Sequence, residues 1–348
     1  MSPVHRKPAA AALLLTLVMA GCGGGGGGGS PTSAAPSGTT TPVDTPAPTP
    51  PASGTPGTPA PAPSSPTGQV GCAAGDSPTV RASAFSLLNV VRTAAGLPGF
   101  VRMSALDGTA QAHAQYVAAN GSGGSEEIPG QPCYTGADYA ARLASAGVAT
   151  VDVSGARSRS ESVLSYVMSG SGDPASWDMV NDLLNNLYGR LLLLDPHTQQ
   201  LGIGFSALPD GPRRAMVVDT ALTAGSAGAG SGVWVVWPRD GATGLPVQMR
   251  ASNLKPLPDG VTEGFPVSLH AGDEVQISRF VMADAATGTP VQATLVTAAN
   301  DRNLLMGRGE AALVPEAPLA PGTTYRVELD GLVASQPMHL TWSFATAP

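Results

Sequence analysis

The sequence has very little positive charge. Lysine occurs only twice, as Lys7 and Lys255, and 18 Lys+Arg stand against 25 Asp+Glu, for a formal net charge of -7. Binding to a nucleic-acid backbone requires clustered Lys and Arg, and the chain has no basic cluster. We therefore exclude a nucleic-acid partner. The scarcity of lysine also excludes a phosphate-binding loop that depends on one.

Residues for common hydrolytic chemistry are also scarce. The chain has five histidines and three cysteines, and it contains neither a Gly-x-Ser-x-Gly nor a His-Glu-x-x-His motif. Many nucleophilic and metal-assisted hydrolases depend on such arrangements. The sequence therefore gives no positive indication of a catalytic centre, and we expect no cofactor.

The first 21 residues are typical of an export signal. A short basic segment precedes an apolar run over 9–19, which is about the length of a signal-peptide core and too short to cross a bilayer. Small residues then lead to Cys22, an order that resembles the lipobox of bacterial lipoproteins. We expect cleavage before Cys22, its acylation, and a membrane-anchored protein in the cell envelope. An ordinary secretory signal with a chance cysteine is the alternative.

A low-complexity segment follows over residues 22–70. It consists mainly of Gly, Pro, Thr, Ser and Ala, with Asp44 as its one charge and no aromatic side chain. Such a segment cannot bury enough apolar surface to offset its conformational entropy, and its prolines favour an extended chain. We expect a disordered stalk.

Residues 71–222 show helical patterns followed by two apolar runs. The expected elements are helices over 78–95, 104–120, 137–146 and after Pro174, and strands over 201–205 and 215–220. Ser104 has the spacing of a capping box at the start of the second helix. The turn between the two strands contains Pro, Asp and Gly, which indicates an antiparallel hairpin.

Four segments in this part resemble the CAP superfamily, also called SCP-like or cysteine-rich secretory and pathogenesis-related proteins. They are residues 88–98, 110–116, 135–137 together with Arg142 and Gly147, and 188–190 ahead of 201–204. The likeness is to a bacterial member. It implies an α-β-α sandwich with helices on both sides of a small antiparallel sheet, which agrees with the helix and strand patterns.

The resemblance also implies a central cleft. Many CAP domains line it with two histidines and two acidic residues, a set that can hold a divalent metal such as zinc. One family histidine falls near Ser125, and the other falls at Gly189, where the family's Tyr-His-Arg reads Tyr188-Gly189-Arg190. Neither serine nor glycine replaces imidazole as a ligand, so we expect no metal site.

The acidic positions of the cleft are partly ambiguous. Glu127 matches one of them, whereas the other is either Asp152 or Glu161, because the segment over 151–173 departs from the family pattern. The expected lining of the cleft is Ser125, Glu127, Glu161, Tyr188, Gly189 and Arg190.

Three other features have a structural and a functional interpretation. His113 is either a lone ligand that turns into the cleft or a packing residue, and its alanine-rich surroundings favour packing. We expect His197 in a solvated turn. Glu126 and Glu127 are either paired carboxylates for acid/base chemistry or an exposed acidic loop, and the loop is favoured because adjacent residues rarely face the same way.

Cys72 and Cys133 remain as a pair once Cys22 is acylated. An exported protein folds under oxidising conditions, which favours a disulfide. Closing a loop of about 60 residues contributes roughly 4 kcal/mol in the chain-entropy model. Two free thiols or a catalytic cysteine are the alternatives, but no histidine stands near either cysteine in the sequence.

A Gly/Ser-rich linker over 223–232 precedes a second unit over 233–348. The expected strands are 233–237, 275–281, 291–296, 325–329 and 340–344, separated by turns rich in Gly, Pro and Asp. Such spacing indicates a β-sandwich, and the final strand resembles the end of bacterial Ig-like domains. The fold class is therefore α+β, with an all-β second domain that spaces or binds.

Two functional classes fit these features. The first is a non-enzymatic, anchored and monomeric binding or scaffold protein whose cleft takes a protein, glycan or lipid ligand. The second is an exported hydrolase that uses what remains of the cleft. Because such a hydrolase needs a metal or a base, the missing histidines favour the first.

Overall fold

The computed structural model describes Cys72 and residues 75–153, 157–169, 172–208, 211–225, 230–250, 252 and 254–348. The expected signal peptide, Cys22, the segment over 22–70 and part of the linker lie outside the described residues. The chain divides into Met1–Ala62 and a compact unit, Pro63–Pro348. Everything described here belongs to the second unit.

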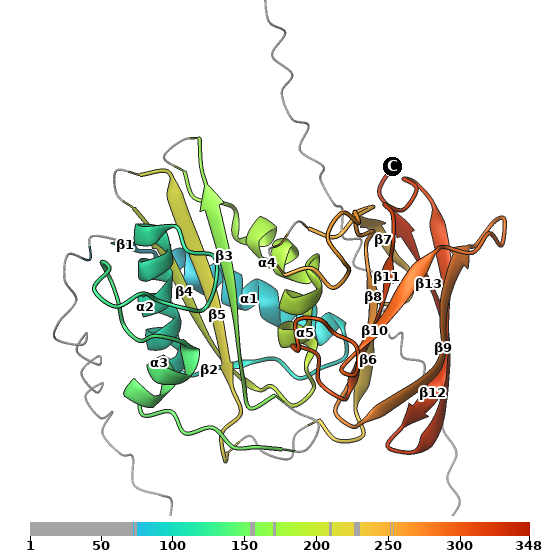
Figure 1. Cartoon of the computed structure of the whole chain (residues 1–348), viewed down its shortest axis with the longest axis horizontal. Coiled ribbons are helices and arrows are strands. Elements are labelled where there is room, and N and C mark those ends of the chain that lie inside the picture. The colour runs from blue at the N-terminus through green and yellow to red at the C-terminus, as the bar shows by residue number, and fades with distance from the viewer. Residues whose placement is uncertain are drawn as a thin grey trace, which may run out of the picture. The chain divides into compact units, whose positions relative to one another are not determined.

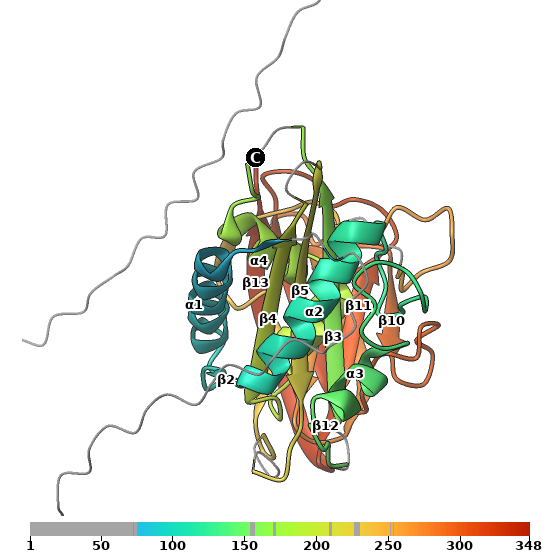
Figure 2. The ribbon, with the colours of Figure 1, turned by 90° about the vertical axis from the view of Figure 1, so that its left-hand side faces the viewer.

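The first domain comprises β1 to β5 and five helices (Figures 1 and 2). In chain order these are β1 (Gly75–Asp76), α1 (Pro78–Ala94), β2 (Val101–Arg102), α2 (Ser104–Asn120), α3 (Tyr139–Ser145), β3 (Arg159–Val167), α4 (Ser176–Leu184), α5 (Leu187–Leu194), β4 (Gln200–Ala207) and β5 (Arg213–Ala221). The sheet order is β1-β4-β5-β3, with β2 beside β4, so β3 is an edge strand.

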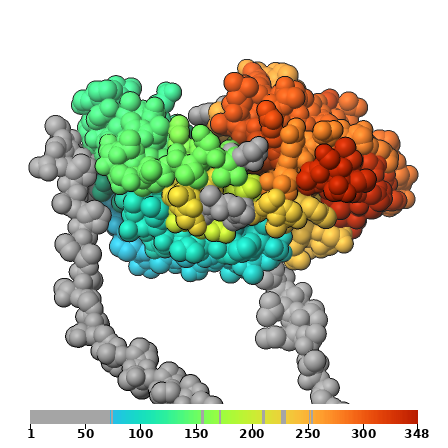
Figure 3. Space-filling model, turned by 90° about the horizontal axis from the view of Figure 1, so that it is seen from below, coloured from blue at the N-terminus to red at the C-terminus, as the bar shows by residue number. Residues whose placement is uncertain are grey.

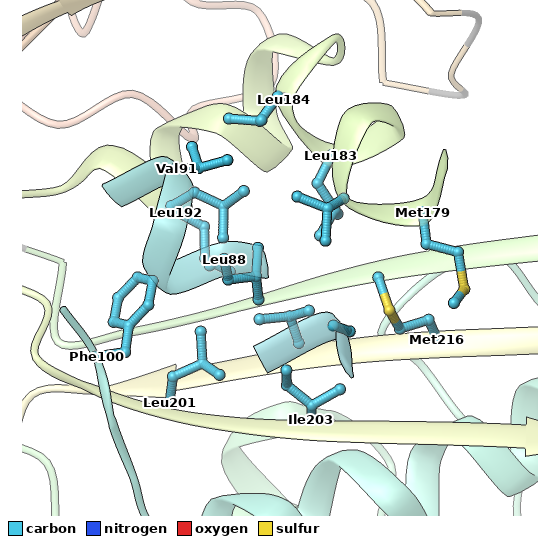
Figure 4. Packing of buried hydrophobic residues seen from close by; sticks show 14 of the residues in the cluster. Leu88, Val91, Phe100, Met179, Leu183, Leu184, Leu192, Leu201, Ile203 and Met216 are labelled. Carbon is cyan, nitrogen blue, oxygen red and sulfur yellow. The ribbon is translucent and has the colours of Figure 1, made fainter. Parts of the chain in front are cut away.

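Alternation along the strands places helices on both faces of this sheet. Met216 and Val218 of β5 join the core beneath α1, α4 and α5, whereas Ala215 and Val217 pack against α2. Figure 4 shows Leu88 of α1 among the leucines of the first of these cores. The expected α-β-α sandwich is therefore confirmed.

Two glycines of β4 allow α2 to pack closely on the sheet. A Cβ atom at Gly202 or Gly204 would lie 2.0 to 2.1 Å from the backbone of α2, a distance that no side chain tolerates. The Gly-x-Gly pattern of β4 therefore reflects direct contact between the helix and strand backbones.

Some expected details were wrong. Ser104 is the first residue of α2 rather than its cap, because Met103 is the N-cap and makes no side-chain capping bond. The fourth helix ends at Leu184, and the separate helix α5 was not expected. The edge strand β3 was also missed, because serines and charged residues interrupt its apolar pattern.

A disulfide joins Cys72 to Cys133, as expected, with their Cα atoms 4.7 Å apart. Cys133 is fully buried and lies with alanines of α2 in the core on that face of the sheet. The bond therefore holds the start of the domain beside the loop that precedes α3.

The C-terminal sandwich comprises β6 to β13. Its strands are β6 (Trp234–Trp237), β7 (Ala242–Leu245), β8 (Val267–Ala271), β9 (Val275–Asp284), β10 (Ala293–Thr297), β11 (Glu310–Pro315), β12 (Thr324–Val333) and β13 (Gln336–Thr346). They form two four-stranded sheets, β10-β11-β8-β6 and β7-β13-β12-β9. Residues of both sheets, such as Leu269 and Val327, share one core. The expected all-β domain is thus confirmed, although β7, β8 and β11 were not anticipated.

The first domain and the C-terminal sandwich are in direct contact, as the surface in Figure 3 shows. Arg157 binds both carboxylate oxygens of Glu310 at 2.7 Å. Leu187 and Leu191 of α5 share a buried cluster with residues of β10 and β11. These contacts place loops of the sandwich beside β3 and α5.

Within the described part of the chain, no helix is long and apolar enough to cross a membrane.

Candidate binding cleft

A cleft of about 870 Å³ lies along β3, between the first domain and loops of the C-terminal sandwich. Its walls are the 123–126 loop and Tyr139 on one side, and α5 with Arg250, Ser252, Leu254 and the 303–306 loop on the other. The cleft is therefore built by both domains.

Four of the six residues expected to line this cleft do so: Ser125, Glu161, Tyr188 and Gly189. Glu161 rather than Asp152 is the acidic residue of the site, because Asp152 is exposed in a connecting segment away from the cleft lining.

The other two expected residues do not line the cleft. Glu127 is buried behind it, so the exposed-loop interpretation is wrong for Glu127 and holds only for its exposed neighbour Glu126. Arg190 points away from the cleft: its Nη1 donates to Pro266 O at 2.7 Å and to Ser268 Oγ at 3.2 Å. Arg190 therefore belongs to the interface with the C-terminal sandwich.

Arg142 joins the two acidic residues of the site. Its Nη2 lies 2.7 and 2.8 Å from the carboxylate oxygens of Glu161, and its Nη1 lies 3.4 Å from Glu127 Oε1. All three side chains are at most 1% exposed. Helix α3, capped by Asp138, holds Arg142 in this position.

His113 supplies a second cation to Glu127. Its Nδ1 lies 2.8 Å from Glu127 Oε1, and its Nε2 lies 2.9 Å from the carbonyl oxygen of Gly124. Burial alone raises the pKa of Glu127, but hydrogen bonds from His113 and from the Thr135 N–H lower it overall. Because neither partner of the ring has a proton to donate, His113 donates from both nitrogens as an imidazolium. The packing interpretation of His113 was right that the side chain is buried. It missed the contacts of the ring with Glu127 and Gly124.

Asp219 lies beside Glu161, directly opposite it in the β3–β5 pair. Burial and the charge of Glu161 raise the pKa of Asp219 well above its usual range. Thr109 Oγ1 lies 2.6 Å from Asp219 Oδ2 and 3.0 Å from Leu106 O. The Thr109 hydroxyl donates to Asp219 Oδ2, and this bond lowers the pKa of Asp219 by less than burial and the charge of Glu161 raise it.

This arrangement does not fit a divalent metal. The two ionised carboxylates, Glu127 and Glu161, are already matched by Arg142 and His113. A side chain at Gly189 would begin 2.7 Å from the Leu183 carbonyl oxygen, so a histidine there is excluded by packing as well as by sequence. Among the described residues, no group of three or more His, Cys, Asp and Glu side chains has a metal-holding arrangement.

Tyr188 connects the cleft to the C-terminal sandwich. Its hydroxyl donates to Asp301 Oδ1 at 2.6 Å and accepts from Asn303 Nδ2 at 2.6 Å. Burial, followed by the hydrogen bond to Asp301, raises the pKa of Tyr188. The hydroxyl is therefore a neutral anchor for the 301–306 segment.

His197 is not in a solvated turn, as the sequence suggested. It is 3% exposed, and its Nε2 lies 2.6 Å from the Gly272 carbonyl oxygen in the C-terminal sandwich. The sequence next to His197 has the pattern of a turn and does not indicate that the C-terminal sandwich covers this histidine.

Sequence reasoning missed several components of the site. Arg142 was noted only as part of the family pattern, and Asp219 was hidden in an apolar run. The wall formed by the C-terminal sandwich gave no signal, because contacts between distant segments leave no local pattern. The one available indication of this site was Arg142, a lone arginine among alanines on the short helix α3.

Residues 85–219 match the model of the cysteine-rich secretory protein family, CAP. The chain therefore carries a CAP domain, which confirms the resemblance found in its sequence. A search of curated proteins found no match.

Two solved structures are similar to part of the chain. One is an outer surface protein from Borrelia burgdorferi, with 15% identity and a TM-score of 0.34, covering 43% of this chain and 97% of that one. The other is an extracellular protein containing an SCP domain from Bacillus anthracis, with 15% identity and a TM-score of 0.32, covering 41% of this chain and 40% of that one.

Proposed function

We propose that the protein is an exported, envelope-anchored CAP protein whose cleft binds a ligand without transforming it. The observation that carries this proposal is the charge balance behind the cleft, where Arg142 and His113 match Glu127 and Glu161. A carboxylate that is already paired with a buried cation is a weaker base and a poorer ligand for a metal ion. The carboxylate of Glu161, which lines the cleft, already accepts two close contacts from Arg142.

The alternative of an exported hydrolase would need one of these carboxylates to act as a base. Glu127 is fully buried and is held by His113 and by the backbone of Thr135 and Gly136. Burial and the charge of Glu161 raise the pKa of Asp219 well above its usual range, and Asp219 does not line the cleft. These features support binding over catalysis, with a protein, glycan or lipid as the ligand class.

Anchoring through Cys22 is the second part of the proposal. The apolar run and the small residues before Cys22 support it, as does the disulfide, which suits an oxidising compartment. The variant Cys22→Ser is expected to leave the membrane fraction or to accumulate as precursor, with folding unchanged. Detergent-phase partitioning of a correctly cleaved Cys22→Ser protein would contradict anchoring.

Binding at the cleft is tested by blocking it. Ser165 is exposed and lines the cleft, whereas Ser83 is exposed on α1, outside the lining. We expect Ser165→Trp to abolish binding of whichever probe the protein takes from a peptide library, a glycan array and a fatty-acid series. Ser83→Trp is the matched control and should bind as the unmodified protein does. Equal binding by both variants would contradict the proposal, as would a failure to bind any probe.

A further inference from the structure

The outer edge of β3 carries backbone groups without partners. Leu222 N–H donates to Ser158 O, and Met168 N–H donates to Pro212 O, which fixes the even-numbered residues as those that bond to β5. In an antiparallel pair the intervening residues direct N–H and C=O the other way. Glu161, Val163 and Ser165 therefore point these groups away from β5, and no described residue hydrogen-bonds to them.

The cleft follows this edge. Seven consecutive residues of β3, from Arg159 to Ser165, line it. Successive side chains of a strand point to opposite faces of a sheet, so a cleft lined by all of them runs along the strand's edge rather than over one face. At about 3.3 Å per residue, this edge is roughly 20 Å long.

Nothing on β3 protects the edge from pairing. Natural edge strands are usually blunted by lysine, proline or an inward-pointing charge. The strand contains neither lysine nor proline. Its one inward charge, Glu161, is neutralised by Arg142. An unprotected edge at the floor of a cleft is therefore available to a further strand.

The two walls beside the edge differ in chemistry. The wall from the C-terminal sandwich carries three exposed leucines, Leu254, Leu304 and Leu305, and Leu304 is 85% exposed. The opposite wall is the polar 123–126 loop. Arg159, at one end of the lining, is exposed and has no ion-pair or hydrogen-bond partner among the described residues.

We propose that the cleft binds an extended polypeptide segment of a partner protein, which adds to β3 as a further strand. The segment has apolar side chains at every second residue, facing the leucine wall, and an acidic residue beside Arg159. This inference rests on the proposed function of the cleft as a binding site and specifies its ligand. A repeating array of backbone donors and acceptors is matched by another extended backbone, a known mode of peptide recognition.

A second copy of this chain does not fit the same edge. Its own β3 lies at the floor of the same cleft, between the 123–126 loop and the loops of the C-terminal sandwich. Two recessed edges cannot reach each other, whereas a single segment enters between the walls.

The experiment uses acetylated nine-residue peptides with Val, Leu or Phe at alternate positions and Asp or Thr between them. Binding to the purified protein is measured by fluorescence polarisation. The tightest peptide is then resynthesised with single backbone N-methyl groups. We expect N-methylation at every second residue to weaken binding at least tenfold and the intervening positions to tolerate it, because only alternate N–H groups face β3.

The matched protein variants are Val163→Pro and Val163→Thr. The N–H of Val163 faces the cleft and not β5, so proline removes one donor from the edge without breaking a bond inside the sheet. We expect Val163→Pro to lose at least tenfold in affinity and Val163→Thr to stay within twofold. The N-methyl scan needs only the unmodified protein, so it decides the matter even if Val163→Pro does not fold.

The inference is overturned if no peptide of the set binds, or if N-methylation at all positions has the same effect. If a glycan or a fatty acid binds instead and Ser165→Trp abolishes that binding, the peptide inference fails while the proposed function stands. If no probe of any class binds, both fail. The unmodified protein could also dimerise, and Val163→Pro could abolish the dimer. That result would assign the edge of β3 to a second copy and would overturn the inference.

Discussion

The guanidinium of Arg142 lies 2.7 and 2.8 Å from the two carboxylate oxygens of Glu161, and both side chains are 1% exposed. The resemblance of the sequence to the CAP superfamily implies that Glu127 and Glu161 stand at acidic positions of a set that can hold a divalent cation. Here two protein cations, Arg142 and His113, supply two positive charges to the same two carboxylates. The charges of the two carboxylates are therefore balanced by protein side chains, without a metal ion.

Removing Arg142 should destabilise the fold strongly. Arg142→Met leaves Glu161 buried without its partner, and breaking a buried ion pair from one side costs about 3–5 kcal/mol. The double variant Arg142→Met with Glu161→Leu removes both charges and should recover much of that loss. Denaturant unfolding measures both. A loss below about 1 kcal/mol in the single variant would show that Arg142 does not carry the balance.

Restoring the family histidine at Gly189 should fail on packing grounds. Even Gly189→Ala places a Cβ atom 2.7 Å from the Leu183 carbonyl oxygen, and overpacking of this kind costs about 1–3 kcal/mol. The matched control is Gly108→Ala, on exposed α2 surface with no atom within 4 Å of the new Cβ. That change should stabilise the protein by up to about 1 kcal/mol. Thermal unfolding that ranks the two variants equally would contradict the close approach of α4 and α5.

Asp219 should make stability fall as the pH rises. Its folded pKa is raised by burial and by Glu161, so the native state keeps a proton that the unfolded chain releases above about pH 4. Stability from this group is complete below the unfolded pKa and is lost as the pH rises towards the folded one. Asp219→Asn keeps the shape of the side chain without the charge, and its amide oxygen can still accept from Thr109.

The stability of Asp219→Asn relative to the unmodified protein should therefore increase from pH 5 to pH 8, as measured by urea unfolding. A difference that stays constant or decreases over this range would show that Asp219 is ionised in the native protein.

The disulfide should contribute through loop closure. Cys72 and Cys133 are 61 residues apart, and the chain-entropy model gives about 4 kcal/mol for a loop of that length. The double variant Cys72→Ala with Cys133→Ala should lose about that much unfolding free energy. Alkylation of the oxidised protein without reductant should modify neither cysteine. A labelled thiol at either position would contradict the bridge in solution.

The sequence was informative wherever one local pattern dominated. The helical spacing before Gly96 predicted α1, and the two apolar runs predicted the β4–β5 hairpin. The strand β3 was missed because an edge strand that lines a cleft carries serines where a buried strand would be apolar. The position of β3 at the edge of the sheet therefore explains both why its sequence lacks an apolar pattern and why its outer backbone groups can pair with a further strand.

The site was predictable only in part for a related reason. Ser125 and Gly189 could be placed because they replace residues of a short motif, and their replacement was visible in the sequence. The role of Arg142 depends on a contact with a residue 19 positions away. The wall from the C-terminal sandwich lies more than 100 residues beyond Ser125 in the chain, and no periodicity reports such contacts.

We propose that Arg142 and His113 balance the charges behind the cleft and that the CAP domain binds its ligand without a metal. The most direct test of this proposal is calorimetric titration of zinc into the purified, metal-stripped protein at pH 7. We expect no stoichiometric binding at micromolar zinc and no change in thermal stability. One zinc ion bound per chain with submicromolar affinity, lost in Glu161→Gln, would contradict the proposal.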